Sequence, residues 1–550
     1  MSYLVMQRLD LLVVGAYFTI LIGNGIFHSM RKTKHGDDFL LGGKSFGVFS
    51  TLCTQGATMK GSGALLGYSA GAFTNGTGVL ISSQCYSLGA WIAIMSGIAR
   101  KIKKCSSTVE IRSSGDLFQR RFDSPILKKL AGVGGAWLAL SIMSGQMAAM
   151  GLLVNLMFGK YGLSYETSLI IGVTVAIAYT AIGGLVSVVY NDVFQWLVMT
   201  PLIFLIIPLA LVVYGGVTPS AVHATLDATQ YFSLQPNIWW LGYLLSGVLA
   251  ACCDVSHLTR FITAKDEKTA VKGSMLGFAY CTLLAGIVIV FGLGAAMLVD
   301  PAVVAGNRDG VLLALVSKIL PAGMVGLFIS AVLATTISTL DSNLQTSVLC
   351  TMVDVVEPFL PENVSDRQKL LYCRLVTLVI AGLSIFFVLK VKGIVAIMGM
   401  GFNVYSSALF FPLMCCMFWS RATEKGCLAG ILSGAATAIA AINLKLPLPI
   451  VWGVAVSSLL TVIVSLATAS ATATRALLPG FDESLAVDRQ VFVACLFGAT
   501  GTLVLSIGVG MWVNWPCIAL GAAGLGICVA MVNHAFGRYG VEMQPAQENA

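Results

Sequence analysis

Apolar segments long enough to cross a lipid bilayer follow one another along nearly the whole chain. A helix needs about 20 predominantly apolar residues to span the hydrocarbon core. Only 11% of the 550 residues are charged, against about 25% in soluble domains, and the mean hydropathy is +0.87. The sequence therefore predicts an all-α membrane protein with about fifteen transmembrane helices, at residues 9–30, 45–73, 78–100, 126–158, 164–186, 188–215, 236–262, 271–299, 311–357, 369–390, 393–419, 426–444, 449–470, 490–509 and 511–533.

Basic residues are concentrated in every second loop of this pattern. The basic loops hold Arg31, Lys32, Lys34, Lys44, Arg100, Lys101, Lys103, Lys104, Arg112, Arg120, Arg121, Arg260, Lys265, Lys268, Lys272, Arg367, Lys369, Arg374, Arg421 and Lys425. The alternate loops hold few, chiefly Lys160, Arg308, Lys390, Lys392 and Lys445. Because loops rich in Lys and Arg stay in the cytoplasm, we expect the N-terminus outside and the C-terminus inside. The net charge of +8 is explained by these loops and indicates no nucleic-acid partner.

The remaining composition excludes several classes of site. The fourteen cysteines lie mostly inside apolar segments, without CxxC pairs or zinc-ligand spacing, so we interpret them as small core residues. The five histidines are scattered and form no HExxH motif, which argues against an intramembrane enzyme. A channel would need a continuous polar pore, and the ionisable residues are too few and too local for one.

Two of the predicted spans are interrupted. Residues 54–71, TQGATMKGSGALLGYSAG, place glycines and small polar side chains midway along an apolar run, and WWLGYLLSGVLAACCDVSH, residues 239–257, contains Ser246, Gly247 and Asp254. A helix can break at membrane depth only where the break is buried in protein or lines a wet cavity. Two such breaks, separated by four intervening spans, suit an inverted repeat of five helices whose solute and ion sites lie at the repeat interface.

Lys60 lies inside the first interrupted span, and two interpretations remain open. The lysine either snorkels to a membrane interface, or it is buried and requires a partner. The candidate partners are Asp254, a carboxylate of a substrate, and helix carbonyls freed by the break. An ion pair between Lys60 and Asp254 would be compatible with a purely structural role.

A third feature is AVLATTISTLDSN, residues 331–343, late in the ninth span. Ser338 and Thr339 place adjacent hydroxyls on a helix, one turn after Thr335, and Asp341 follows. Hydroxyl and carbonyl oxygens of this kind suit a weakly bound hard cation such as sodium. The alternative is that these hydroxyls bond the carbonyl one turn back or allow close helix packing.

Three segments together resemble the sodium:solute symporter family. GGLVSVVYNDVFQ (183–195) is similar to the family signature GG-x-x-x-V-x-x-T-D-x-x-Q, AVLATTISTLDS to its sodium-site helix, and FLLGGKSFG (39–47) to its F-x-x-x-G-R-S lead into the first core helix. The resemblance extends from about residue 9 to 420. It implies coupled uptake by alternating access and a fold like that of the leucine transporter, with two inverted five-helix repeats. The expected division is an extra N-terminal helix and loop (1–44), first repeat (45–215), second repeat (216–419), additional helices (420–533) and a disordered tail (534–550).

The resemblance also implies the residues of the sites. The sodium site would use backbone carbonyls of Gly56, Met59 and Thr335 with the hydroxyls of Ser338 and Thr339. Asp192 would lie on the ion's inward exit route, and Asp341 is a possible second ion or proton site. The expected solute-binding residues are Thr58, Lys60, Ser62, Gln84, Gln146 and Asp254.

Within the family, ATMKGSGALLG and AVLATTISTLDSN resemble the choline-transporter branch. Choline needs an aromatic cage, but the expected cage positions hold Met59, Ala149 and Asp254, none of which is aromatic, so no cage is expected from these positions. A fixed cation at Lys60 would also repel choline. The favoured interpretation is that Lys60 holds an anionic or zwitterionic solute while Asp254 meets its amine. The alternative is that the charge of Lys60 replaces the ion, which gives proton-coupled or uncoupled transport.

The sequence thus predicts a multi-pass protein of the cell membrane, cytoplasmic or inner, that is not an enzyme. Its expected partners are a small-molecule solute, Na⁺ as coupling ion and the lipid bilayer, with no other metal. A solute sensor that keeps the transporter fold is the remaining rival class.

Overall fold

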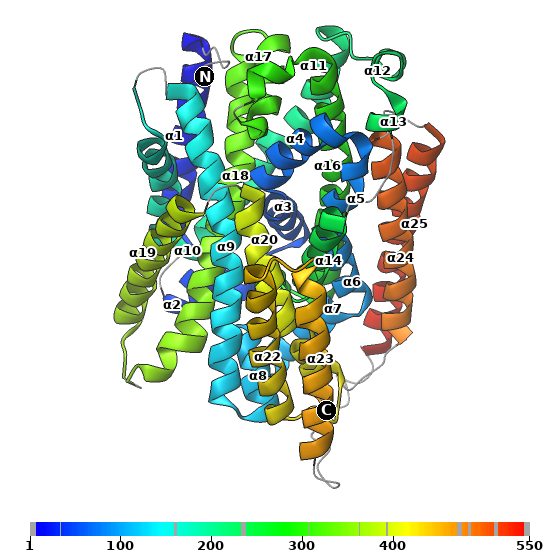
Figure 1. Cartoon of the computed structure of the whole chain (residues 1–550). Helices are drawn as coiled ribbons and strands as arrows, with labels where there is room; N and C mark the ends of the chain where they lie inside the picture. Colours follow the sequence, from blue (N-terminus) through cyan, green and yellow to red (C-terminus); the bar gives the residue numbers. More distant parts are fainter. Residues whose placement is uncertain are drawn as a thin grey trace.

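The computed structural model describes residues 7–32, 35–158, 162–232, 238–305, 307–361, 363–391, 394–469, 476–481, 486–510 and 515–543. Figure 1 shows a bundle built from helices. The α-helices are α1 (Arg8–Lys32), α2 (Gly36–Leu41), α3 (Val48–Met59), α4 (Tyr68–Asn75), α5 (Val79–Ser83), α6 (Cys85–Met95), α7 (Ile98–Thr108), α8 (Ser114–Phe122), α9 (Pro125–Phe158), α10 (Tyr165–Pro201), α11 (Ile207–Val213), α12 (Pro219–Thr225), α13 (Ala228–Tyr231), α14 (Ile238–Cys252), α15 (Val255–Thr263), α16 (Glu267–Leu298), α17 (Val311–Ile319), α18 (Met324–Cys350), α19 (Asp366–Lys390), α20 (Ile394–Tyr405), α21 (Phe411–Phe418), α22 (Glu424–Asn443), α23 (Pro449–Thr468), α24 (Ala486–Gly510) and α25 (Trp515–Met543).

Among the described residues, 13 helices are long and apolar enough to cross a membrane. The difference from the fifteen predicted spans arises at two pairs of spans. One long apolar segment, Gly63–Met95, runs across parts of the predicted spans at 45–73 and 78–100. The predicted spans at 164–186 and 188–215 correspond to α10, which has a non-helical kink at Gly184, and to its continuation through residues 202–213. Gly184 has φ of +58°, and a Cβ there would lie 2.4 Å from the carbonyl oxygen of Phe39, so the bend requires glycine.

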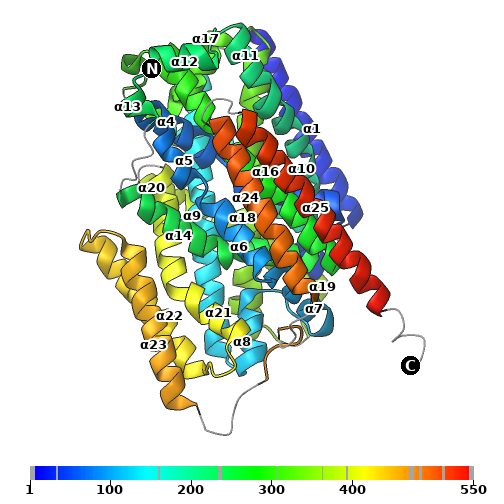
Figure 2. The ribbon, with the colours of Figure 1, turned by 90° about the vertical axis from the view of Figure 1, so that its right-hand side faces the viewer.

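The centre of the bundle is α3, which packs against α10, α16 and α18 (Figure 1). Around it α9 contacts α10, α18 and α20, and α14 contacts α6 and α20. The pairs α22–α23 and α24–α25 lie on separate flanks of this core (Figure 2). The first turn of α1 and the last turn of α25 lie at opposite ends of the bundle in both views, as an odd number of crossings requires.

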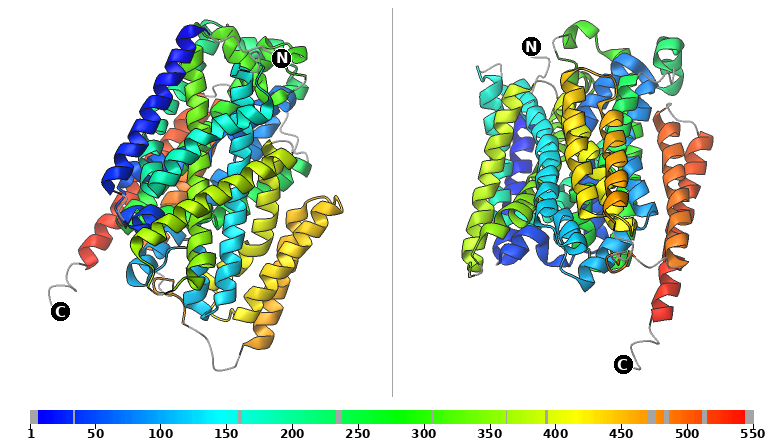
Figure 3. Two further views of the ribbon diagram at one scale, coloured as in Figure 1. Left: turned by 90° about the vertical axis from the view of Figure 1, so that its left-hand side faces the viewer. Right: turned by 60° about the horizontal axis from the view of Figure 1, so that its bottom comes forward.

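The outer helices expose large apolar side chains to their surroundings. Examples are Val379 and Phe386 on α19 and Leu459 and Ile463 on α23; α19 lies at the edge of the bundle, and α22 and α23 project from it in Figure 3. The residues of α18, in contrast, are buried almost throughout. Apolar side chains that face outward around a buried central helix are expected of a bundle surrounded by lipid. The chain is therefore a multi-pass membrane protein.

Two features differ from the predictions. A disordered tail was expected from residue 534, but α25 continues to Met543. Phe536 on this helix is buried, and just before it Lys272 Nζ donates to Asn533 Oδ1 at 3.0 Å. Residues 544–550 lie outside the described residues. The basic residues 100–104, expected in a loop, form part of α7, and the buried Arg100 donates to Asp488 Oδ1 at 2.6 Å. This ion pair ties α24 to the core.

Candidate functional site

The first interruption follows α3. The backbone of Lys60 has φ of −125° and ψ of 79°, and the helix resumes after Gly61. The amide N–H of Ser62 then lacks a helical partner, and Gln146 Oε1 from α9 accepts hydrogen bonds from both Ser62 N (2.8 Å) and Ser62 Oγ (2.6 Å). A Cβ on Gly61 would lie 2.3 Å from Gln146 Oε1. The predicted break is confirmed, and it is held by a side chain from another helix.

Lys60 is buried at this break. Its side chain is 2% exposed, Nζ donates to the carbonyl oxygen of Ser83 at 2.6 Å, and it lies 5.7 Å from the ring centroid of Tyr68. The interface interpretation is therefore wrong. No ion pair joins Lys60 to Asp254 in the described part of the chain, and the partner is a carbonyl oxygen. One of the three ammonium hydrogens is thus engaged.

The second interruption lies between α14 and α15. Asp254 is the N-cap of α15: Oδ1 accepts from Ser256 N at 2.9 Å, and Oδ2 accepts from the hydroxyl of Tyr86 at 2.6 Å. Ser246 and Gly247 do not contribute to the break, because α14 is continuous there. Gly247 instead permits close packing on α6, since a Cβ would lie 2.7 Å from Cys85 Sγ.

A compact cavity of about 40 Å³ lies between the two breaks, enough for about three water molecules. Four of the predicted solute-binding residues line it, namely Thr58, Lys60, Gln146 and Asp254. Ser62 adjoins it through its bond to Gln146. Gln84 lies elsewhere: Nε2 donates to Ser506 Oγ at 2.8 Å, towards α24, because the turn at residue 84 directs this side chain away from the cavity.

Aromatic rings line the cavity at positions that the sequence reasoning missed. Phe402 packs against Tyr86 at 5.5 Å and against Tyr243 at 5.9 Å between ring centroids, and Tyr68 completes the set. Of the three expected cage positions, Met59 and Asp254 line the cavity, whereas Ala149 is buried elsewhere on α9. These rings come from four different segments, so no local motif marks them.

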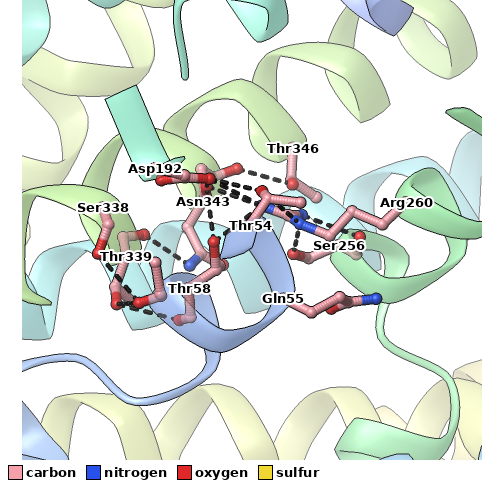
Figure 4. Close-up of polar contacts among 12 residues, drawn as sticks. Thr54, Gln55, Thr58, Asp192, Ser256, Arg260, Ser338, Thr339, Asn343 and Thr346 are labelled. Carbon is pink, nitrogen blue, oxygen red and sulfur yellow. Dashed lines mark hydrogen bonds and ion pairs between the residues drawn. The ribbon is translucent and has the colours of Figure 1, made fainter. Parts of the chain in front are cut away.

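The hydroxyl pair of α18 faces the last turn of α3 (Figure 4). Ser338 Oγ lies 3.0 Å from the carbonyl oxygen of Ala57, and Thr339 Oγ1 lies 3.0 Å from those of Thr58 and Thr335. Both bonds across the helix pair and bonds one turn back are therefore present. Within the described residues neither hydroxyl bonds the carbonyl of Gly56 or Met59, so Ala57 and Thr58 join the predicted oxygen set. Neutral oxygens in this arrangement fit a hard monovalent cation.

A buried charged network lies beside this oxygen set (Figure 4). Asp192 Oδ2 accepts from Thr54 Oγ1 at 2.5 Å and lies 4.0 Å from Arg260 Nη2. The same guanidinium nitrogen donates to Thr58 Oγ1 at 2.9 Å and to Ser342 Oγ at 2.7 Å. The network therefore joins α3, α10, α15 and α18 next to the candidate ion site.

Arg260 was expected in a basic loop, and the structure corrects this. It lies on α15, is 3% exposed and also donates to the carbonyl and hydroxyl oxygens of Ser256. The available signal was its spacing of three residues from His257 in an apolar segment, which places both on one helix face. Asp341 is buried on α18 and interacts electrostatically with Arg260, but it does not line the cavity.

Comparison with known proteins identifies the family. The sodium:solute symporter family matches residues 39–434. The chain belongs to this family. It is 28% identical over 445 residues to the sodium/proline symporter of Escherichia coli K12, covering 76% of this chain and 84% of that protein. It is 25% identical over 450 residues to the sodium/pantothenate symporter of the same organism, covering 78% and 89%.

A solved structure of a Na⁺-coupled sialic acid symporter, in a substrate-bound outward-open state, has a TM-score of 0.70 with 18% identity and covers 84% of this chain and 98% of that chain. The match confirms the leucine-transporter fold. Family and relatives are transporters, in agreement with a function other than enzymatic. The resemblance to the choline-transporter branch stays a prediction.

Proposed function

We propose that this protein is a secondary active transporter that uses a sodium gradient to take up a small carboxylate-bearing or zwitterionic solute by alternating access across the cytoplasmic (inner) membrane. The observation that carries the proposal is the cavity between two helix breaks, one bearing a buried lysine and the other an aspartate. Breaks at membrane depth supply backbone groups for ions and polar solutes.

The coupling ion is sodium in this proposal. Support comes from the family and from the oxygens of Ala57, Thr58, Thr335, Ser338 and Thr339, which meet between α3 and α18. None of these groups is charged, and neutral oxygens bind a monovalent ion weakly enough to release it. Sodium held there links the end of α3 to α18, so that occupancy of the site affects the conformation of the neighbouring cavity.

Lys60 receives the carboxylate of the solute. Lys60 lines the cavity, and within the described part of the chain its ammonium group makes one hydrogen bond, so two N–H donors are available to an anion. A buried cation with so little compensation is costly, and a bound carboxylate offsets that cost.

The alternative, in which the charge of Lys60 replaces the ion, requires its ammonium group at the oxygen set of α3 and α18. Its hydrogen bond to Ser83 O directs it towards the junction of α5 and α6 instead. Sodium coupling is therefore the better-supported function. A solute sensor would bind the same solutes without accumulating them.

Uptake into proteoliposomes tests the proposal. The panel contains amino acids, imino acids, simple organic acids and quaternary amines, each with a sodium gradient, a proton gradient or neither. We expect accumulation of a carboxylate-bearing member above equilibrium only with inward sodium, and a rise of about tenfold or more in its half-saturating concentration in Lys60→Met, since a hydrogen bond to a charged group contributes about 1.5–3 kcal/mol. The exposed Lys265→Met serves as control. Accumulation driven by protons alone would support the alternative, and binding without accumulation would support a sensor.

A further inference from the structure

Two hydrogen-bond acceptors lie side by side in the wall of the cavity. His257 Nε2 is 3.9 Å from Asp254 Oδ2, and both residues line the cavity. His257 is 2% exposed, and its Nε2 has no hydrogen-bond partner among the described residues. A buried ring nitrogen without a partner is costly unless something else in the cavity satisfies it.

The opposite ring nitrogen defines the tautomer. His257 Nδ1 lies 2.9 Å from Gln55 Oε1, and the amide nitrogen of Gln55 donates to Ser274 Oγ at 3.2 Å. A carbonyl oxygen only accepts, so Nδ1 carries the hydrogen. In the neutral imidazole Nε2 then presents a lone pair to the cavity.

Asp254 supplies the second acceptor. Oδ1 accepts the N-cap bond and Oδ2 accepts one bond within the described ranges, from Tyr86, so Oδ2 keeps capacity for a further donor. An ammonium nitrogen at an ordinary distance of about 2.9 Å from each acceptor bridges a gap of this size with two of its hydrogens. A donor with one N–H satisfies one acceptor, and a quaternary nitrogen satisfies neither.

We propose that the solute carries an ammonium group with at least two N–H bonds, donated to His257 Nε2 and Asp254 Oδ2. The inference rests on the proposed function, in which Lys60 holds the carboxylate of the same solute. The substrate class is then a primary or secondary amino acid rather than a betaine. The neighbouring rings of Tyr86 and Phe402 pack around the carbon skeleton instead of forming a cage for a quaternary nitrogen.

Binding of N-methylated series to the purified full-length protein in lipid nanodiscs at saturating sodium tests this. The first series is glycine, sarcosine, N,N-dimethylglycine and glycine betaine, with three, two, one and no N–H bonds. The second is L-proline, N-methyl-L-proline and N,N-dimethyl-L-proline, with two, one and none. We expect affinity to hold while two N–H bonds remain and to fall about tenfold or more at one, since a charged hydrogen bond is lost. Equal affinity along both series would overturn the inference.

Two variants of His257 separate the acceptor from the fold. His257→Asn keeps a donor for Gln55 and removes the acceptor at the Nε2 position, whereas His257→Gln keeps an acceptor at that position. In His257→Asn we expect weaker binding of sarcosine and L-proline and unchanged binding of propionate, which has no amine. His257→Gln should recover part of the affinity. Equal losses for amine and propionate in His257→Asn would show a structural role and contradict the assignment.

The outcomes also separate the inference from the proposed function. If propionate and other simple carboxylates bind and no amino acid in either series does, the ammonium site is wrong and carboxylate transport stands. If nothing carrying a carboxylate binds with sodium present, the proposed function fails together with this assignment.

Discussion

The two helix breaks that bound the cavity differ in how they are stabilised. At the first break, Gln146 on α9 accepts a hydrogen bond from the backbone amide of Ser62, which has no helical partner there. The side chain of Lys60 makes no capping hydrogen bond to α3 within the described residues. At the second, Asp254 caps α15 with its own side chain. The first break therefore depends on a distant helix, whereas the second is held by local sequence.

Because of this difference, Asp254 and Lys60 have different roles. Asp254 is fixed by two protein hydrogen bonds and belongs to the fold as well as to the site. Among the residues that the structure describes, Lys60 makes a single hydrogen bond, to a carbonyl oxygen, which leaves its other two N–H donors for a solute. The predictions below test whether fold and function divide in this way.

The largest expected effect is at Arg260, next to the second break. Arg260→Met leaves the carboxylate of Asp192 buried without its cation, and we expect a loss of about 3–5 kcal/mol in stability. The double variant Arg260→Met with Asp192→Asn should recover much of this, because no buried charge then remains unpaired. Thermal and denaturant unfolding in detergent measure both, with the exposed Arg367→Met as control. Equal destabilisation in the single and double variants would exclude charge burial as the cause.

The next largest effect is expected at Gly61, in the first break. A Cβ at residue 61 would lie 2.3 Å from Gln146 Oε1 and 2.8 Å from Thr339 Oγ1, so Gly61→Ala displaces both the side chain that caps the break and the hydroxyl of the proposed sodium site. We expect sodium-driven uptake to fall by about 100-fold, as displacements of about 1 Å at a functional site do. Gly382→Ala is the matched control, because nothing lies within 4 Å of its Cβ position. Near-normal uptake in Gly61→Ala would show that the break tolerates side chains.

A direct comparison of the two charged residues gives a smaller effect. Asp254→Ala removes an N-cap and should lower stability by about 0.5–2 kcal/mol, while Asp254→Asn keeps a capping oxygen and should lose little. Lys60→Met should leave stability unchanged or raise it, since it removes a buried charge. Unfolding midpoints of the three variants decide the point. Greater destabilisation by Lys60→Met than by Asp254→Ala would contradict the assignment of a structural role to Asp254 and not to Lys60.

Sequence reasoning succeeded where the signal was local. A helix break or a set of oxygen atoms can be recognised within one short segment in three places. These are the glycines around Lys60, the carboxylate of Asp254, and the hydroxyls of Ser338 and Thr339. It failed where the outcome depends on a contact between distant segments. Gly247 looked like a break but serves packing against α6, and Gln84 faces α24 rather than the cavity.

Arg260 shows the same limit from the other side. Sequence position near the end of an apolar run suggested a cytoplasmic loop, because charged residues usually mark the membrane boundary. Its burial depends on acceptors from three other helices, including Asp192, Thr54 and Ser342. No periodicity within residues 238–263 encodes the positions of those acceptors.

The central claim is that sodium binds between the end of α3 and the hydroxyls of α18 and thereby drives solute into the cell. Its most direct test is the sodium dependence of uptake in the variant Ser338→Ala with Thr339→Ala, at saturating solute. The account predicts a rise of about tenfold or more in the sodium concentration for half-maximal uptake, since the proposed ion site loses two hydroxyl ligands. An unchanged sodium requirement in a folded double variant would contradict it.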